Sequence, residues 1–66
     1  MVDRAFLKTY LVWLETASID ELESRRQRVL EGIALLRDPV NRRDAKYLLR
    51  LLEAEIFARR TLLQKS

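Results

Sequence analysis

The chain has no cysteine and no histidine among its 66 residues, and it has one glycine and one proline. The absence of cysteine excludes a disulfide, a thiolate nucleophile and a Cys-ligated zinc site. The absence of histidine excludes an imidazole base, an imidazole metal ligand and a histidine switch near neutral pH. Its serines have no candidate base, and Glu53 and Glu55 project from different sides of one predicted helix. We therefore expect a protein that is not an enzyme and that holds no metal and no cofactor.

No apolar run approaches the roughly 20 residues of a membrane span. The first residues also lack the pattern of a secretory signal, because Asp3 and Lys8 interrupt it. We therefore expect a cytoplasmic protein with no membrane partner. A membrane-surface anchor built on Phe6, Tyr10 and Trp13 is the weaker alternative, because the same segment carries few cations.

What the sequence does have is apolar residues spaced at steps of three and four, with 48% of residues hydrophobic and 35% charged. This spacing predicts an all-α fold, a single domain over 1–66 with helices at about 3–17, 19–37 and 39–64. Ser18 and Glu21 have the spacing of a capping box at the first break. At the second break, Asp38 followed by Pro39 ends one helix and caps the next, with Asn41 as an alternative start.

The third predicted segment is too apolar around its circumference for a single neighbour. Its apolar residues are Ala45, Tyr47, Leu48, Leu49, Leu51, Leu52, Ile56, Ala58, Leu62 and Leu63. They cover about 200°, whereas packing on one neighbour needs about 100°. The short connection before the segment predicts a long antiparallel helical hairpin. We expect the short first helix and this hairpin to pair with a second copy as a homodimeric helical bundle, although the first helix covering the same face within one chain stays open.

Glu55 and Arg59 lie inside this apolar face, four residues apart, and the hairpin brings them near Arg26. We expect a partly buried charge pair or triad among these residues that sets the register, with a pocket for an anionic ligand as the alternative. The predicted protein interface is Leu48, Leu52, Glu55, Ile56, Arg59, Arg26 and Trp13. The expected function is a small non-catalytic protein-interaction or regulatory module, whose partners are a second copy and another protein.

The net charge of +3 lies on the last third of the chain, where residues 39–66 hold seven basic and three acidic residues. Arg42, Arg43, Lys46 and Arg50 lie on its polar side, with Phe57 as a nearby ring. A basic ridge beside an aromatic ring is typical of a phosphate-tracking surface. The alternative function is therefore a dimeric helical nucleic-acid-binding protein that uses these four cations, and the plainer interpretation is a solvated face.

Gly32 stands in the middle of the second predicted helix. Glycine in a helix interior costs about 1 kcal/mol relative to alanine. Its presence suggests that another helix approaches closely at this point.

Overall fold

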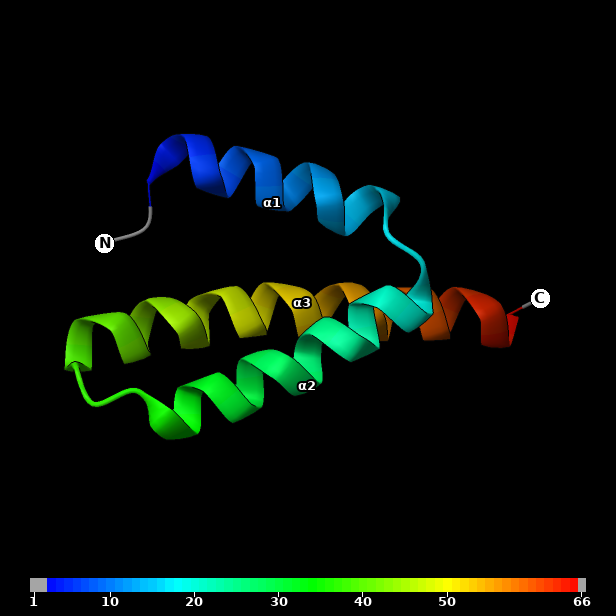
Figure 1. Cartoon of the computed structure of the whole chain (residues 1–66). Helices are drawn as coiled ribbons and strands as arrows, with labels where there is room; N and C mark the ends of the chain where they lie inside the picture. Colours follow the sequence, from blue (N-terminus) through cyan, green and yellow to red (C-terminus); the bar gives the residue numbers. More distant parts are fainter. Residues whose placement is uncertain (1–2, 66) are drawn as a thin grey trace.

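The described part of the chain is built from helices alone (Figure 1). The computed structural model describes the backbone of residues 3–65 and the side chains of residues 3–62. Its helices are α1 (Arg4–Thr16), α2 (Ile19–Leu35) and α3 (Pro39–Lys65). Residues 1, 2 and 66, at the ends of the predicted domain, lie outside the described residues. The prediction of an all-α chain with three helices is confirmed.

A capping box separates α1 from α2, as the sequence predicts. Oγ of Ser18 accepts a hydrogen bond from the Glu21 amide at 3.1 Å, and Oε1 of Glu21 accepts one from the Ser18 amide at 3.3 Å. These bonds satisfy amides that have no partner within the helix. The flanking Ala17 and Leu22 are both buried, so the same turn also brings two apolar side chains into the core.

α2 ends at Leu35, two residues before the predicted end at Arg37. Leu36 is already extended, with φ −75° and ψ 132°. Proline disfavours the helical conformation at Asp38, which directly precedes it, and Leu36 and Arg37 are already non-helical. Leu36 and Arg37 are then needed to span the connection to the next helix.

α3 begins at Pro39 and is capped by Asp38. Oδ1 of Asp38 accepts hydrogen bonds from the amides of Val40 at 2.8 Å and Asn41 at 3.4 Å. Proline suits the first helical position because its fixed φ matches the helix and its missing amide would be unpaired there anyway. The alternative start at Asn41 is not used.

α3 lies between α1 and α2 in Figure 1 and contacts both of them. In that view the chain runs rightward along α1, returns leftward along α2 and runs rightward again along α3. The Cα atoms extend over 43 × 25 × 15 Å. For comparison, the Cα atoms of a single helix lie on a cylinder about 5 Å across. The three helices enclose few side chains on all sides, since only five of the residues whose burial is described are buried.

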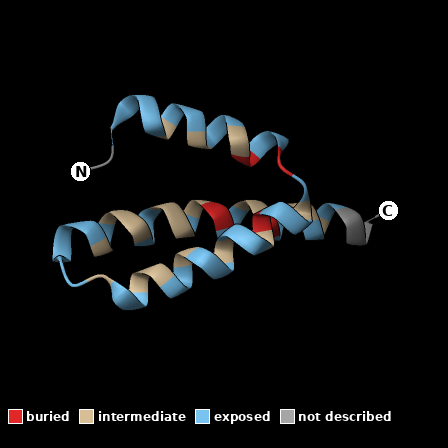
Figure 2. Cartoon of the chain, viewed as in Figure 1, coloured by how far each residue is buried: buried red, intermediate tan, exposed pale blue. Residues whose placement is uncertain are grey.

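The buried core is small and lies where α1 joins α2, against the middle of α3 (Figure 2). Among residues whose burial is described, the buried ones are Leu14, Ala17, Leu22, Leu52 and Ile56. Partly buried side chains pack around them: Tyr10, Trp13, Ile19 and Leu51. Nine large apolar side chains of the same described residues are exposed: Phe6, Leu11, Val12, Leu30, Leu35, Val40, Tyr47, Phe57 and Leu62. More large apolar side chains therefore face solvent than lie in the core.

Candidate interaction surfaces

The central residues of the predicted protein interface are engaged within the chain itself. Leu52 and Ile56 belong to the buried core, with exposed fractions of 0% and 6%. Leu48 is half-buried, and its carbonyl oxygen accepts a hydrogen bond from the Tyr10 hydroxyl at 2.9 Å. A partner protein would meet neither Leu52 nor Ile56 in this fold, because α1 and α2 cover the centre of the apolar stripe on α3.

Arg59 holds the C-terminal end of α1 instead of pairing with Glu55. Its guanidinium donates hydrogen bonds to the carbonyl oxygens of Leu14 at 2.7 Å, Glu15 at 3.2 Å and Ala17. These carbonyls lie where helical hydrogen bonding stops and the helix dipole is negative. A forked cation satisfies several of them at once. The structure therefore corrects the predicted Glu55–Arg59 pair, because the backbone of α1 takes up the guanidinium.

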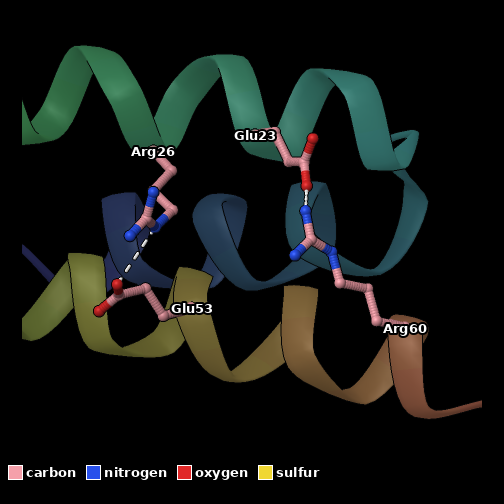
Figure 3. Close-up of polar contacts among 4 residues, drawn as sticks. All are labelled: Glu23, Arg26, Glu53 and Arg60. Carbon is pink, nitrogen blue, oxygen red and sulfur yellow. Dashed lines mark hydrogen bonds and ion pairs between the residues drawn. The ribbon is translucent and has the colours of Figure 1, made fainter.

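Glu55 lies on the side of α3 that faces α1, where it lines a shallow hollow with Leu11, Glu15 and Leu51. Arg26 approaches α3 on another side, and its Nε donates to Oε2 of Glu53 at 3.1 Å (Figure 3). The predicted charge cluster of Glu55, Arg59 and Arg26 is therefore not assembled. Arg26 and Arg59 have separate partners, because α1 and α2 pack on different sides of α3.

Two ion pairs join α2 to α3 on one face, with α1 behind both helices in Figure 3. Arg26 pairs with Glu53, and Glu23 pairs with Arg60. All four side chains are partly exposed, so each pair contributes at most about 1 kcal/mol to stability. Sequence reasoning missed Glu23, Glu53 and Arg60 as partners. The sequence does contain a signal for these pairs. On each helix an acid precedes a base, so two helices that run in opposite directions bring each acid beside a base.

Phe57 is the most exposed aromatic side chain of the described residues, with 73% of its surface free. It lines a hollow of about 520 Å³ beside the two ion pairs. The residues Glu23, Arg26, Glu53, Phe57 and Arg60 are termed the Phe57 surface. Leu30 is 37% exposed and follows Arg26 by four residues, which places it on the same side of α2.

Trp13 is half-buried at the end of a row of aromatic rings on α1. The ring centroids of Phe6 and Tyr10 lie 6.1 Å apart, and those of Tyr10 and Trp13 lie 5.9 Å apart. The Arg25 guanidinium lies over the Trp13 ring, 5.4 Å from its centroid. Burial raises the pKa of Tyr10, and the nearby Arg25 charge opposes this effect. These contacts fix Trp13 within its own chain.

The four cations predicted for the nucleic-acid alternative lie together at the N-terminal half of α3. The hollow that they share measures about 560 Å³ and is lined by Pro39, Arg42, Arg43, Lys46, Tyr47 and Arg50. These six residues are termed the Tyr47 surface. Arg42 is half-buried and donates to the carbonyl oxygen of Leu36 at 3.0 Å, so it is fixed at the end of α2. Arg43, Lys46 and Arg50 are exposed.

The ring among these cations is Tyr47, whereas the sequence assigns that role to Phe57. Tyr47 is 46% exposed, and Phe57 lines the other hollow. Sequence reasoning placed Tyr47 in the apolar face of the third helix. The missed signal is its spacing, four residues after Arg43 and three before Arg50, which puts all three on one side of α3.

Among the described residues, no group of three acids, histidines or cysteines is placed to hold a metal ion. None of the helices in that part of the chain has both the length and the hydrophobicity to cross a membrane. No known protein-family model matches the chain, and no curated protein or solved structure shows significant similarity to it.

Proposed function

We propose that the chain is a small, non-catalytic helical interaction or regulatory module that docks through helix faces and pairs with a second copy of itself. The observation that carries this proposal is the imbalance between five buried residues and nine exposed large apolar side chains in the described chain. A chain of about 60 residues buries only about 60% of its unfolded surface. Small domains without disulfides or metals commonly gain the missing stability by association.

In this proposal α2 and α3 form an antiparallel pair that serves as one half of a homodimeric bundle. Two features support this arrangement. The connection between the helices is short, which favours antiparallel neighbours. Glu23 precedes Arg26 on α2 and Glu53 precedes Arg60 on α3, yet each acid pairs with the base of the other helix. That crossed pairing supports an antiparallel arrangement of the two helices.

The Phe57 surface is the proposed contact between the two copies. In a two-fold dimer a surface meets its own copy, so it must carry its own complement. The Phe57 surface has two acids, two bases and an exposed ring. A buried aromatic centre with a polar rim is the usual anatomy of a protein interface. The equal numbers of opposite charges make a second copy of this chain a better occupant than a strongly charged partner.

The experiment compares Phe57→Glu with Leu35→Glu by light scattering on a sizing column over a range of protein concentrations. Both residues are exposed, with free fractions of 73% and 82%, and both variants add one negative charge. Loss of a central aromatic residue costs about 2 kcal/mol or more, so Phe57→Glu should weaken self-association at least about thirtyfold. Leu35→Glu, outside the Phe57 surface, should leave it unchanged. Equal effects of the two variants would contradict the proposed contact.

A second candidate function is nucleic-acid binding by the Tyr47 surface. The observation that favours it is the shared hollow that four cations form on one end of α3. Lys and Arg side chains that neutralise phosphates make affinity fall steeply as salt rises. A mobility-shift experiment with mixed-sequence DNA and RNA at two salt concentrations tests this candidate. Retardation at low salt that disappears at high salt supports it, and no retardation at low salt rejects it.

A further inference from the structure

The Tyr47 surface combines three exposed cations with one exposed aromatic ring. Arg43, Lys46 and Arg50 are exposed, and they step along α3 by three and four residues. They therefore form one row that extends over about 10 Å at 1.5 Å per residue. The Tyr47 ring lies within this row and is 46% exposed. Arg42 is held by the Leu36 carbonyl, which fixes one wall of the hollow.

An exposed ring inside a cationic row favours one kind of nucleic acid over the other. In a duplex the bases stack on each other, so a ring on the protein surface has no free base to contact. In a single strand each unpaired base offers a face to an aromatic side chain, while the phosphates follow the cations. A surface built for duplex DNA would instead need side chains that enter a groove. A straight row on one helix side matches the single strand better.

We propose that the Tyr47 surface binds single-stranded nucleic acid. An unpaired base stacks on the Tyr47 ring, and neighbouring phosphates contact Arg43, Lys46 and Arg50. This inference rests on the second candidate function and adds the strand type, the stacking residue and the division of roles among the cations. It is independent of self-association, because the Phe57 surface shares no residue with the Tyr47 surface.

The test measures binding of the full chain to a fluorescent single-stranded oligo-dT of about 12 nucleotides by anisotropy, at several salt concentrations. Tyr47→Phe keeps the stacking face and should bind within about twofold of the parent chain. Tyr47→Leu keeps apolar bulk but loses the ring, so affinity should fall at least about fivefold, with an unchanged salt dependence. Circular dichroism confirms that each variant keeps its helices.

The proposed phosphate contacts of the cations are tested by how the affinity for the oligonucleotide depends on salt concentration. Lys46→Gln should lower the slope of log affinity against log salt by about 0.7, the value for one phosphate contact on a single strand. Lys8→Gln removes the same charge from an exposed position on α1 and should leave the slope unchanged. An equal loss of slope in both variants would show that net charge, and not the Tyr47 surface, binds the strand, and would overturn the inference.

Binding to a duplex of the same length distinguishes a preference for single strands from nucleic-acid binding in general. Tighter binding to the single strand than to the duplex, with a loss in Tyr47→Leu, supports the inference. Equal or tighter duplex binding with no effect of Tyr47→Leu overturns it but leaves nucleic-acid binding standing. No binding to either form at low salt rejects both.

Discussion

Tyr10 links α1 to α3 through a phenol that the fold favours in its protonated form. Its hydroxyl donates to the Leu48 carbonyl at 2.9 Å, and burial raises its pKa above the ordinary value of 10.0. A raised pKa in the folded state means that the hydroxyl stabilises the fold fully below pH 10. That contribution is lost as the pH rises from 10 through the folded pKa.

The Tyr10→Phe variant isolates the contribution of the Tyr10 hydroxyl to the stability of the fold. Below about pH 9 the variant should be less stable by about 1 kcal/mol, because it lacks one partly buried hydrogen bond. At higher pH the difference from the parent chain should shrink, because only the parent loses stability by ionising this phenol. Urea unfolding followed by circular dichroism at a series of pH values measures the difference in stability and its change with pH. A difference that stays constant up to about pH 11 would contradict the assignment.

Arg59 is predicted to control the attachment of α1. Its guanidinium reaches three carbonyls at the C-terminal end of that helix, two of them at 2.7 Å and 3.2 Å. Arg59→Leu should lower the free energy of unfolding by about 2 kcal/mol, because a hydrogen-bonded charge is lost. Hydrogen exchange should accelerate mainly in α1. Arg59→Lys should recover only part of the protection, since an ammonium lacks the planar fork. Unchanged exchange in α1 would contradict this role.

Among the helices, α2 contains a glycine that the described chain does not require. A Cβ placed on Gly32 would meet nothing within 4 Å, and its φ is not positive. The close helix approach expected from the sequence is therefore absent within the described residues.

Gly32→Ala should raise the free energy of unfolding by about 1 kcal/mol, because alanine loses less backbone freedom on folding. The reverse change at the exposed Ala34, two residues further along α2, should lower it by a similar amount. Urea unfolding of both variants checks this pair. A loss of stability in Gly32→Ala would mean that a second chain packs directly against the bare backbone.

The helix ends show what local sequence can determine. The Ser18–Glu21 capping box and the Asp38 cap depend on residues three positions apart or fewer, and both are confirmed. The partners of Arg26 and Arg59 lie 27 to 45 residues away. Choosing them requires the rotation of each helix about its own axis, which periodicity fixes only to within a broad stripe. The predicted charge cluster was wrong for this reason.

The uncertain rotation of each helix also limited the prediction of the Tyr47 and Phe57 surfaces. Arg42, Arg43, Lys46 and Arg50 were predicted as a group because they lie within nine residues of one helix. Their aromatic neighbour was misassigned, because Tyr47 lies at the edge of the apolar face and was counted with it. Phe57 lies on the same side of the helix as the cations but seven residues beyond Arg50. The ion pairs around Phe57 join two helices, so no single segment of sequence contains their signal.

At the level of the whole chain, the flat shape and the distribution of apolar side chains lead to one conclusion. The Cα atoms extend over only 15 Å in the smallest dimension, and the buried core lies around the α1–α2 turn and the middle of α3. Exposed apolar residues occur on all three helices. A chain built in this way is expected to gain stability by associating, and its stability should then depend on protein concentration.

Sedimentation equilibrium on the unmodified chain tests this conclusion most directly. We predict a mass that approaches twice the 7.9 kDa of one chain as the concentration rises, with thermal unfolding that shifts upward in parallel. A mass of 7.9 kDa at every concentration, together with concentration-independent unfolding, would contradict the account.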